Sequence, residues 1–321
     1  MKKPSPKYEP SERFTVEKDG FYGSYYEPEK NNFSGKGMVV CSGSDGSFLL
    51  TTLGAEKFYE AGMPVIALGY WNTEGTPQGD SNIPVEYMQK ACHWLKENKG
   101  LHPGVWGISL GGCYVLLSAS LFPEIECVVA VSPMHVLIQG GSFKHGIHFE
   151  QDGPFTYQGK MLPFVKLDEE TCRKHARIIK RNLLLKQEPD MLFHYQKIME
   201  DAKDPDVCIK VENIKGPILL LSGGEDVMLP SNQICRIIMK RLQENHFAYP
   251  YKHCNYPILS HYVTPLKPMT TKFFRVERKH PEECDANREK SWRDTLEFLQ
   301  NEWKVQRREE KCLIQRNCFD A

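Results

Sequence analysis

The stretch GVWGISLGG at residues 104–112 decides how the rest of the chain is interpreted. An apolar run leads into the pattern Gly-x-Ser-x-Gly at residues 107–111, and a helix-like run follows at residues 113–121. A strand that turns sharply into a helix holds the central serine at a strained apex with its hydroxyl exposed. Glycines suit the flanking positions, because a Cβ there would strike the neighbouring strand or helix. The bare pattern also arises by chance, but this context favours Ser109 as a nucleophile.

The backbone near this turn offers donors for an oxyanion. The N–H of Leu110 opens the predicted helix and is expected to point toward an oxyanion that forms at Ser109. A second turn, SGSDGS at residues 42–47, follows a short apolar strand and can supply another N–H. Ser44, Asp45 and Gly46 are therefore candidate oxyanion-hole positions. The simpler interpretation of residues 42–47 is a plain connection between a strand and a helix.

Composition indicates a globular enzyme and excludes several other classes. The chain has 321 residues, of which 40% are hydrophobic and 26% charged, and this suits one large soluble domain with an insertion. Lys+Arg and Asp+Glu both number 41, so no charge excess indicates binding to nucleic acid or to an anionic membrane. No run of 18 apolar residues predicts a membrane-spanning helix. Eleven cysteines without C-x-x-C spacing, and no signal peptide, predict free thiols and a cytoplasmic location.

Apolar strands alternate with amphipathic helices along most of the chain. Each predicted strand is a continuous apolar run, which is typical of a parallel sheet covered on both faces. The fold class is therefore predicted to be α/β, with a mostly parallel, doubly wound sheet. Strands are expected at residues 38–41, 64–68, 104–108, 127–131, 217–222 and 247–256, and helices at 49–61, 85–97, 113–121, 231–245 and 288–304.

The same pattern divides the chain into segments. Residues 1–36 are expected to be a lead-in with a hairpin, residues 37–304 the main domain, and residues 305–321 a charged tail. Residues 135–210 break the alternation and are expected to form a lid or cap that shapes a substrate pocket. This insertion contains His145, His148 and Glu150, whose spacing does not match metal ligands on one helix face. They are interpreted as surface polar residues, and no metal site is expected.

An acyl-transfer serine needs a base for its proton and a third group that orients the base. Ser109, Asp226 and His261 occur in the order nucleophile, acid, histidine, each just beyond a predicted strand. The carboxyl ends of parallel strands are where catalytic groups gather in open α/β sheets. The sequence therefore predicts a triad of these three residues.

Two positions of this triad have alternatives. Glu225 is adjacent to Asp226, and either carboxylate is able to accept a hydrogen bond from the histidine. Asp226 is preferred because it lies farther past the predicted strand end and has room to turn inward. His246 and His253 are weaker candidates for the base, because the first closes a predicted helix and the second lies within a predicted strand.

With these residues in place, the chain resembles the C-terminal catalytic domain of the acyl-CoA thioesterase and bile acid-CoA:amino acid N-acyltransferase family. The similarity runs from about Gly37 to Trp303. It is clearest at residues 42–46, 67–72, 106–112, 223–226 and 260–265. The resemblance implies an α/β-hydrolase fold, with Ser109 as nucleophile, Asp226 orienting His261, and His261 as base. It also implies acyl-CoA thioesters as substrates and chemistry that needs no cofactor.

Within this family, the acyltransferase branch looks like a cysteine-nucleophile branch, whereas this chain has serine. Cys113 lies about one helical turn beyond the apex, so it cannot take the place of Ser109. The resemblance therefore favours hydrolysis. Thioesterases of the family carry an N-terminal β-sandwich domain, and the resemblance here covers the hydrolase domain without it. A carboxylesterase on oxygen esters, an acyl-CoA:amino acid N-acyltransferase and a non-catalytic binding protein remain alternatives.

Overall fold

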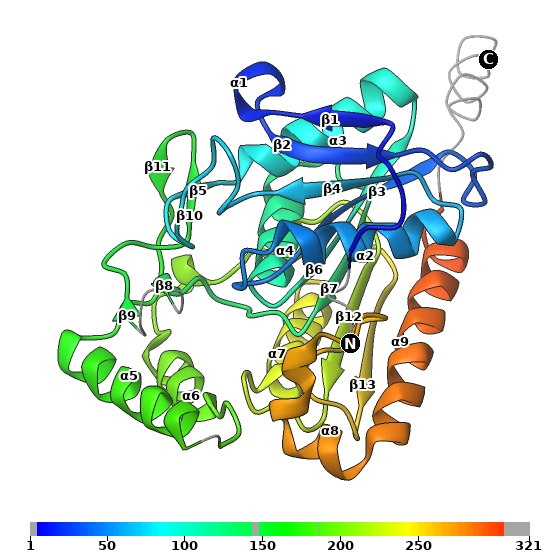
Figure 1. Ribbon diagram of the computed structural model, residues 1–321. Coiled ribbons are helices and arrows are strands. Elements are labelled where there is room, and N and C mark those ends of the chain that lie inside the picture. The colour runs from blue at the N-terminus through cyan, green and yellow to red at the C-terminus, as the bar shows by residue number, and fades with distance from the viewer. Residues whose placement is uncertain (1–4, 143–147, 186, 305–321) are drawn as a thin grey trace.

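The computed structural model describes residues 5–142, 148–185 and 187–304, and within them eight strands form one sheet in the order β1-β2-β4-β3-β6-β7-β12-β13 (Figure 1). Neighbouring strands from β4 to β13 in this order are parallel, whereas β2 is antiparallel to both β1 and β4. The strands are β1 (Glu12–Phe14), β2 (Tyr22–Tyr26), β3 (Lys36–Cys41), β4 (Val65–Gly69), β6 (His102–Ile108), β7 (Cys127–Val131), β12 (Ile218–Gly223) and β13 (Tyr251–Tyr256).

Helices cover both faces of this sheet, and alternate strand residues pack toward them (Figure 1). On β3, Val39 joins the apolar cluster of one face, while Met38 and Val40 join the cluster of the other. The first face carries α3 (Glu86–Lys99), α4 (Leu110–Leu121) and α7 (Ser231–Glu244), and the second carries α2 (Phe48–Glu60) and α9 (Pro281–Asn301). The predicted α/β class with a mostly parallel sheet is confirmed.

Most predicted elements are present, with ends displaced by a few residues. Strand β7 has the predicted bounds, whereas the helix after Ser109 begins at Leu110 rather than three residues later. The closing helix α9 begins at Pro281, well before the predicted start at residue 288. Proline is favoured in the first turn of a helix, and Glu282 and Glu283 add favourable negative charge there.

The N-terminal segment is part of the main sheet. Strands β1 and β2 form the predicted hairpin, joined by the short helix α1 (Val16–Asp19). Strand β2 also pairs along its whole length with β4, so the expected lead-in at residues 1–36 contributes two strands to the sheet of the main domain. The aromatic side chains of Phe14, Phe21 and Tyr25 are buried in the apolar core and explain this attachment. The expected charged tail at residues 305–321 lies outside the described residues.

The segment at residues 135–210 lies between β7 and β12 and interrupts the alternation of strands and helices. It contains α5 (Glu169–Leu184) and α6 (Leu192–Asp201), which stand together on the side of the molecule away from α9 (Figure 1). Strand β10 pairs with β5, which lies just before α3, and so attaches this segment to the main domain. We call residues 135–210 the cap.

The remaining elements are short. Most of them lie in the cap or in the segment that follows β13. They are β5 (Ile83–Pro84), β8 (Gly141–Ser142), β9 (His148–Phe149), β10 (Phe155–Tyr157), β11 (Lys160–Met161), the 3₁₀ turns η1 (Pro205–Val207), η2 (Val211–Asn213) and η3 (Met269–Phe273), and the helix α8 (Arg275–Lys279). Across the described ranges, no helix is both long and apolar enough to cross a bilayer. The nine cysteines of the same ranges are all free.

Replacing Gly54 with alanine is expected to stabilise the protein. Gly54 lies inside α2, where a Cβ would lie 3.4 Å from Val40 Cγ1, an ordinary van der Waals contact. Because glycine in a helix interior is less favourable than alanine, the free energy of unfolding should rise by about 0.5–1 kcal/mol in urea denaturation. Gly216→Ala is the opposite control, because its Cβ would overlap the Glu126 carbonyl. A lower stability for Gly54→Ala would contradict this packing of α2 on β3.

Candidate active site

Ser109 lies at the turn between β6 and α4 in a backbone conformation that non-glycine residues rarely adopt. Its φ is 58° and its ψ is −119°. Such a conformation costs free energy and persists only where the surroundings hold it. Ser109 N donates to Val131 O at 2.8 Å, and Cys113 N donates to Ser109 O at 3.1 Å. The neighbouring strand and the first turn of α4 therefore hold the serine at the apex of the turn.

The two glycines of the pattern allow three segments of backbone to meet at this turn. A Cβ on Gly107 would overlap the Gly111 carbonyl, and a Cβ on Gly111 would overlap the Ser42 carbonyl. Strand β6, helix α4 and the loop after β3 are therefore in backbone contact. This contact brings residues 42–47 next to Ser109.

The loop at residues 42–47 contacts the serine directly. A Cβ on Gly43 would lie only 3.0 Å from Ser109 Cβ, so backbone of this loop lies against the serine side chain. Ser44 lines the same cavity as Ser109 and Leu110, and its role in an oxyanion hole stays a prediction. Gly43 was not predicted as a site residue. Its lack of a side chain was the only feature of the sequence that could have indicated this close approach to Ser109.

Asp45 and Gly46 are arranged differently from Ser44. Asp45 is exposed, and its carboxylate accepts a hydrogen bond from Ser47 N at 2.8 Å. Gly46 has a φ of 56° and lies against the Trp71 ring. Neither residue is among those that line the cavity beside Ser109 in the described structure. Their predicted role in an oxyanion hole stays a prediction, and the geometry favours the earlier part of the loop.

Asp226 and His261 form a buried pair at the carboxyl ends of β12 and β13. Asp226 Oδ2 accepts a hydrogen bond from His261 Nδ1 at 2.8 Å, and the two residues are only 7% and 2% exposed. Asp226 Oδ1 accepts from the backbone N–H groups of Met228 and Leu229, both at 3.0 Å. The carboxylate is therefore fixed by its own loop and presents one oxygen to the histidine.

The alternatives considered from the sequence lie elsewhere. The Glu225 side chain is exposed to solvent, and the backbone N–H of the same residue donates to Leu259 O at 3.1 Å. His253 lies in β13, where its Nε2 is 2.7 Å from Ser222 Oγ. His246 lies just beyond the end of α7. The structure therefore brings together Asp226 and His261 rather than any of these.

The loop that carries His261 is held by hydrogen bonds of two serines, neither of which was predicted as a site residue. Ser132 Oγ donates to the His261 carbonyl at 3.0 Å. Ser260 Oγ donates to Glu277 Oε1 at 2.6 Å, and Glu277 is paired with Arg288. Glu277 and Arg288 are both buried, so this ion pair is a rigid attachment beneath the histidine. Only the tertiary fold brings Ser132 to His261 and Glu277 to Ser260.

Ser109 and His261 are linked through the end of β7. Ser109 N donates to Val131 O, and the next residue, Ser132, donates to the His261 carbonyl. Among the described residues, no hydrogen bond joins the His261 ring to the Ser109 hydroxyl. Catalytic hydrogen bonds of this kind often tighten only when substrate binds.

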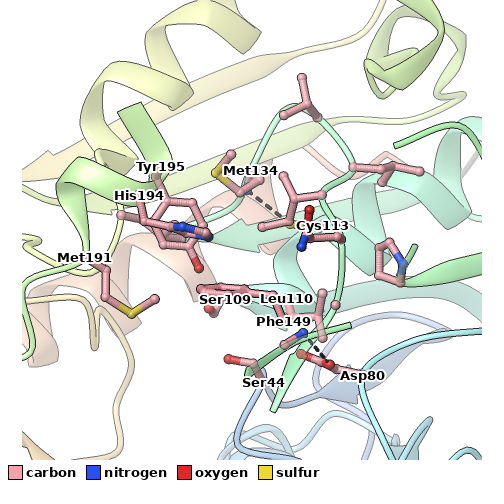
Figure 2. A pocket seen from close by; sticks show the side chains of 18 of the residues that line it. Ser44, Asp80, Ser109, Leu110, Cys113, Met134, Phe149, Met191, His194 and Tyr195 are labelled. Carbon is pink, nitrogen blue, oxygen red and sulfur yellow. Dashed lines mark hydrogen bonds between the residues drawn. The ribbon is translucent and has the colours of Figure 1, made fainter. Parts of the chain in front are cut away.

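A cavity that is partly open to solvent lies between Ser109 and the cap. In Figure 2, His194 and Tyr195 stand on one side of it and Asp80 on the other, with Ser109 between them. Most of its walls are apolar, contributed by Cys113, Met134, Val136, Leu137, Ile138, Phe149, Pro154, Phe155, Met191 and Leu229. Apolar walls with a few polar groups are typical of small-molecule sites.

His194 forms an uncharged part of this wall. It lies on α6, is 2% exposed, and stacks on the Phe149 ring with the ring centres 4.5 Å apart. Its Nδ1 lies 2.9 Å from Nδ1 of His175 on α5, so one imidazole donates and the other accepts. Burial, and then the nearby His175, lower the pKa of His194 to about 3. The side chain is therefore neutral at physiological pH.

Cys113 is the other nucleophilic side chain on this wall. Its Sγ accepts a hydrogen bond from Met134 N at 3.2 Å (Figure 2). Burial raises the pKa of the Cys113 thiol to about 12, so the thiol stays protonated. The thiolate is the reactive form of cysteine, and Cys113 is therefore no rival to Ser109 as a nucleophile.

Metal ligands were not expected from the sequence. In the part of the chain that the structure describes, no group of three or more His, Cys, Asp or Glu side chains is arranged to hold a metal ion. His145, which the sequence places near His148 and Glu150, lies outside the described residues.

The class of the protein follows from the sheet and its strained serine turn: it has the α/β-hydrolase fold. A putative dienelactone hydrolase from Klebsiella pneumoniae subsp. pneumoniae has a similar structure, with a TM-score of 0.50 at 12% identity. The similarity covers 88% of this chain and 93% of that one. At this level of identity, the likeness shows the fold alone.

The family model described as BAAT / Acyl-CoA thioester hydrolase C terminal matches residues 83–304. The chain belongs to this family, as its resemblance indicated. Human acyl-coenzyme A thioesterase 1 is 27% identical over 75% of this chain and 51% of its own length. Mouse mitochondrial acyl-coenzyme A thioesterase 2 is 28% identical over 64% of this chain and 40% of its own length. The chain thus spans about half the length of these relatives, and its cytoplasmic location stays a prediction.

Removing the imidazole of His194 is expected to change how stability depends on pH. The lowered pKa of His194 means that, between pH 6.5 and about 3, the unfolded chain binds a proton that the folded chain does not. The contribution of His194 to the free energy of unfolding is fully present above pH 6.5 and is lost as the pH falls toward about 3. In His194→Gln, the slope of unfolding free energy against pH between 6 and 4.5 should decrease by up to about 1.4 kcal/mol per pH unit.

The matched control is His93→Gln, which removes an exposed histidine from α3. Its slope should follow that of the wild type in urea denaturation at the same pH values. Equal slopes for His194→Gln and the wild type would show that His194 takes up its proton while the protein is folded.

Proposed function

We propose that the protein is a serine acyl hydrolase that cleaves acyl-CoA thioesters through an acyl-enzyme on Ser109. The observation that carries this proposal is the buried Asp226–His261 pair at the carboxyl ends of β12 and β13, on the same edge of the sheet as the strained Ser109 turn after β6. An oriented histidine next to a serine of this kind is the arrangement that activates a hydroxyl for acyl transfer.

The reaction follows from the roles of these groups. His261 takes the hydroxyl proton as Ser109 Oγ attacks the thioester carbonyl, and Asp226 keeps the imidazole in the tautomer with a basic Nε2. The N–H of Leu110 and an N–H of the loop at residues 43–46 stabilise the oxyanion, on the order of 3 kcal/mol for each donor. His261 then gives the proton to the leaving sulfur. Water clears the acyl-enzyme in a second step, with His261 again as base.

The apolar walls of the cavity beside Ser109 are suited to an apolar acyl group of the substrate. Val136, Phe155 and Leu229 belong to its walls and come from the cap and from the loop before α7. Burial of methylene groups against such walls favours binding by about 0.8 kcal/mol for each CH₂. The thioester preference is proposed from the family and from the two relatives that are named as acyl-coenzyme A thioesterases.

Ser109→Ala is expected to abolish turnover. Loss of the nucleophile should lower kcat by at least about 10³-fold, because the remaining groups cannot form an acyl-enzyme. The assay compares wild type and variant on acyl-CoA thioesters of several lengths and on p-nitrophenyl esters of the same acids. A fluorophosphonate should label the wild type and leave the variant unlabelled. Unchanged turnover of every substrate would refute the mechanism.

The same assay separates the other functions. Ester turnover without CoA release would assign the protein to the carboxylesterases. A glycine or taurine conjugate formed in the presence of either amine would assign it to the acyltransferases. Absence of both labelling and turnover in the folded wild type would indicate a non-catalytic binding protein.

Asp226→Asn should lower kcat by about 10⁴-fold, because an amide stabilises the wrong imidazole tautomer. Glu225→Gln is the matched control, since it alters the adjacent exposed carboxylate. Its kcat should stay within about threefold of the wild type, as expected for a surface substitution. Steady-state kinetics on one acyl-CoA thioester measures both. A large loss in Glu225→Gln with an active Asp226→Asn would reverse the assignment of the acid.

A further inference from the structure

A second cavity lies on the opposite side of the loop at residues 42–46. It is partly open to solvent. Ser42 and Asp45 line it from the loop, whereas Ser44 faces the cavity beside Ser109. Its far wall comes from the segment after His261, with Tyr262, Thr264, Leu266 and Pro268. Among the described residues, the two cavities share no lining residue.

The proposed reaction divides the substrate into two arms. The acyl arm becomes bonded to Ser109, so it belongs in the cavity that Ser109 itself lines. The thiol arm must leave on the side of His261, because His261 gives its proton to the departing sulfur. The second cavity is bounded by Tyr262, the residue after His261, and its ring centre lies 5.8 Å from that of the histidine.

We infer that this second cavity, the thiol cavity, binds the leaving half of the substrate as a narrow chain of methylene segments that carry amide groups. The inference rests on the proposed function. It assigns the thiol cavity as a second subsite, for the thiol half of the same substrate. A chain of this type is the arm that joins the thiol of CoA to its nucleotide.

The walls match such a chain. Leu50, Ile108 and Leu266 supply apolar surface for methylene groups. The Asp45 carboxylate is an acceptor suited to an amide N–H. Thr270 donates its hydroxyl hydrogen bond to Tyr262 Oη at 3.1 Å, so the tyrosine keeps its own proton for an amide carbonyl. Burial, and the charge of nearby Asp45 less strongly, raise the pKa of Tyr262, so this proton is retained.

Leu50→Trp tests the inference in the full chain. Leu50 is half-buried at the wall, and an indole there should fill much of the thiol cavity. The substrates are thioesters of one acyl chain with CoA and with N-acetylcysteamine, a short thiol. We expect the ratio of kcat/KM for CoA over N-acetylcysteamine to fall by at least about tenfold, and the preferred acyl length to stay unchanged. Leu266→Trp probes the opposite wall and should have the same effect.

Ile138→Trp is the matched control. Ile138 is also half-buried, but it lines the cavity beside Ser109. This variant should shift the preference toward shorter acyl chains, while the ratio between the two thiols stays within about twofold. Fluorophosphonate labelling and thermal unfolding confirm that each variant is folded.

The outcomes separate this inference from the proposed function. A shift in acyl length in Leu50→Trp would mean that the thiol cavity holds the acyl chain. An unchanged ratio between the thiols, in either thiol-cavity variant, would mean that it holds no part of the substrate. Either result overturns the inference and leaves the mechanism on Ser109 intact. A wild type that cleaves only oxygen esters would overturn the thiol assignment, and one that neither turns over nor is labelled would overturn both proposals.

Discussion

The contact on which the site depends is between backbone and backbone, where the first turn of α4 meets the loop after β3. Gly111 lies against the Ser42 carbonyl without space for a side chain, and Gly107 lies equally close to Gly111. This approach sets Ser109 at a φ of 58° and places Gly43 against it. The strain is maintained because β3 and β7 hold β6 on either side, and Ser109 N itself donates to Val131 O.

The second constraint is electrostatic, and it lies beneath His261. A buried carboxylate is costly unless it is hydrogen-bonded, and Asp226 meets this condition through two backbone N–H groups and one imidazole. Below the histidine, the buried pair of Glu277 and Arg288 fixes Ser260. Asp226 thus holds the histidine ring and Ser132 holds its backbone carbonyl, each from a different element.

The sequence was sufficient for the features that local chemistry determines. Continuous apolar runs identified the parallel strands. The strand ends predicted Ser109, Asp226 and His261 as site residues, and the structure pairs Asp226 with His261. The sequence was insufficient for features that depend on contacts between residues far apart in the chain. The attachment of β1 and β2 depends on pairing with β4, and no local pattern near residue 20 reports that partner. Ser132 reaches His261, and Glu277 reaches the preceding Ser260, only through the tertiary fold. The short strands of the cap are too brief to leave a periodic signal.

The attachments of the cap have a consequence for how a family of such proteins can diversify. Strand β10 pairs with β5. Met191 N also donates to the carbonyl of Val227, the residue after Asp226, at 2.8 Å. The cap is therefore joined to the main domain at separate places, and its inner side forms a wall of the cavity beside Ser109. A single exchange of one wall side chain for a larger or smaller one redraws the cavity while the strand ends keep their geometry. Under the proposed function, selectivity for the acyl group is thereby open to change one residue at a time, independently of the residues at the strand ends.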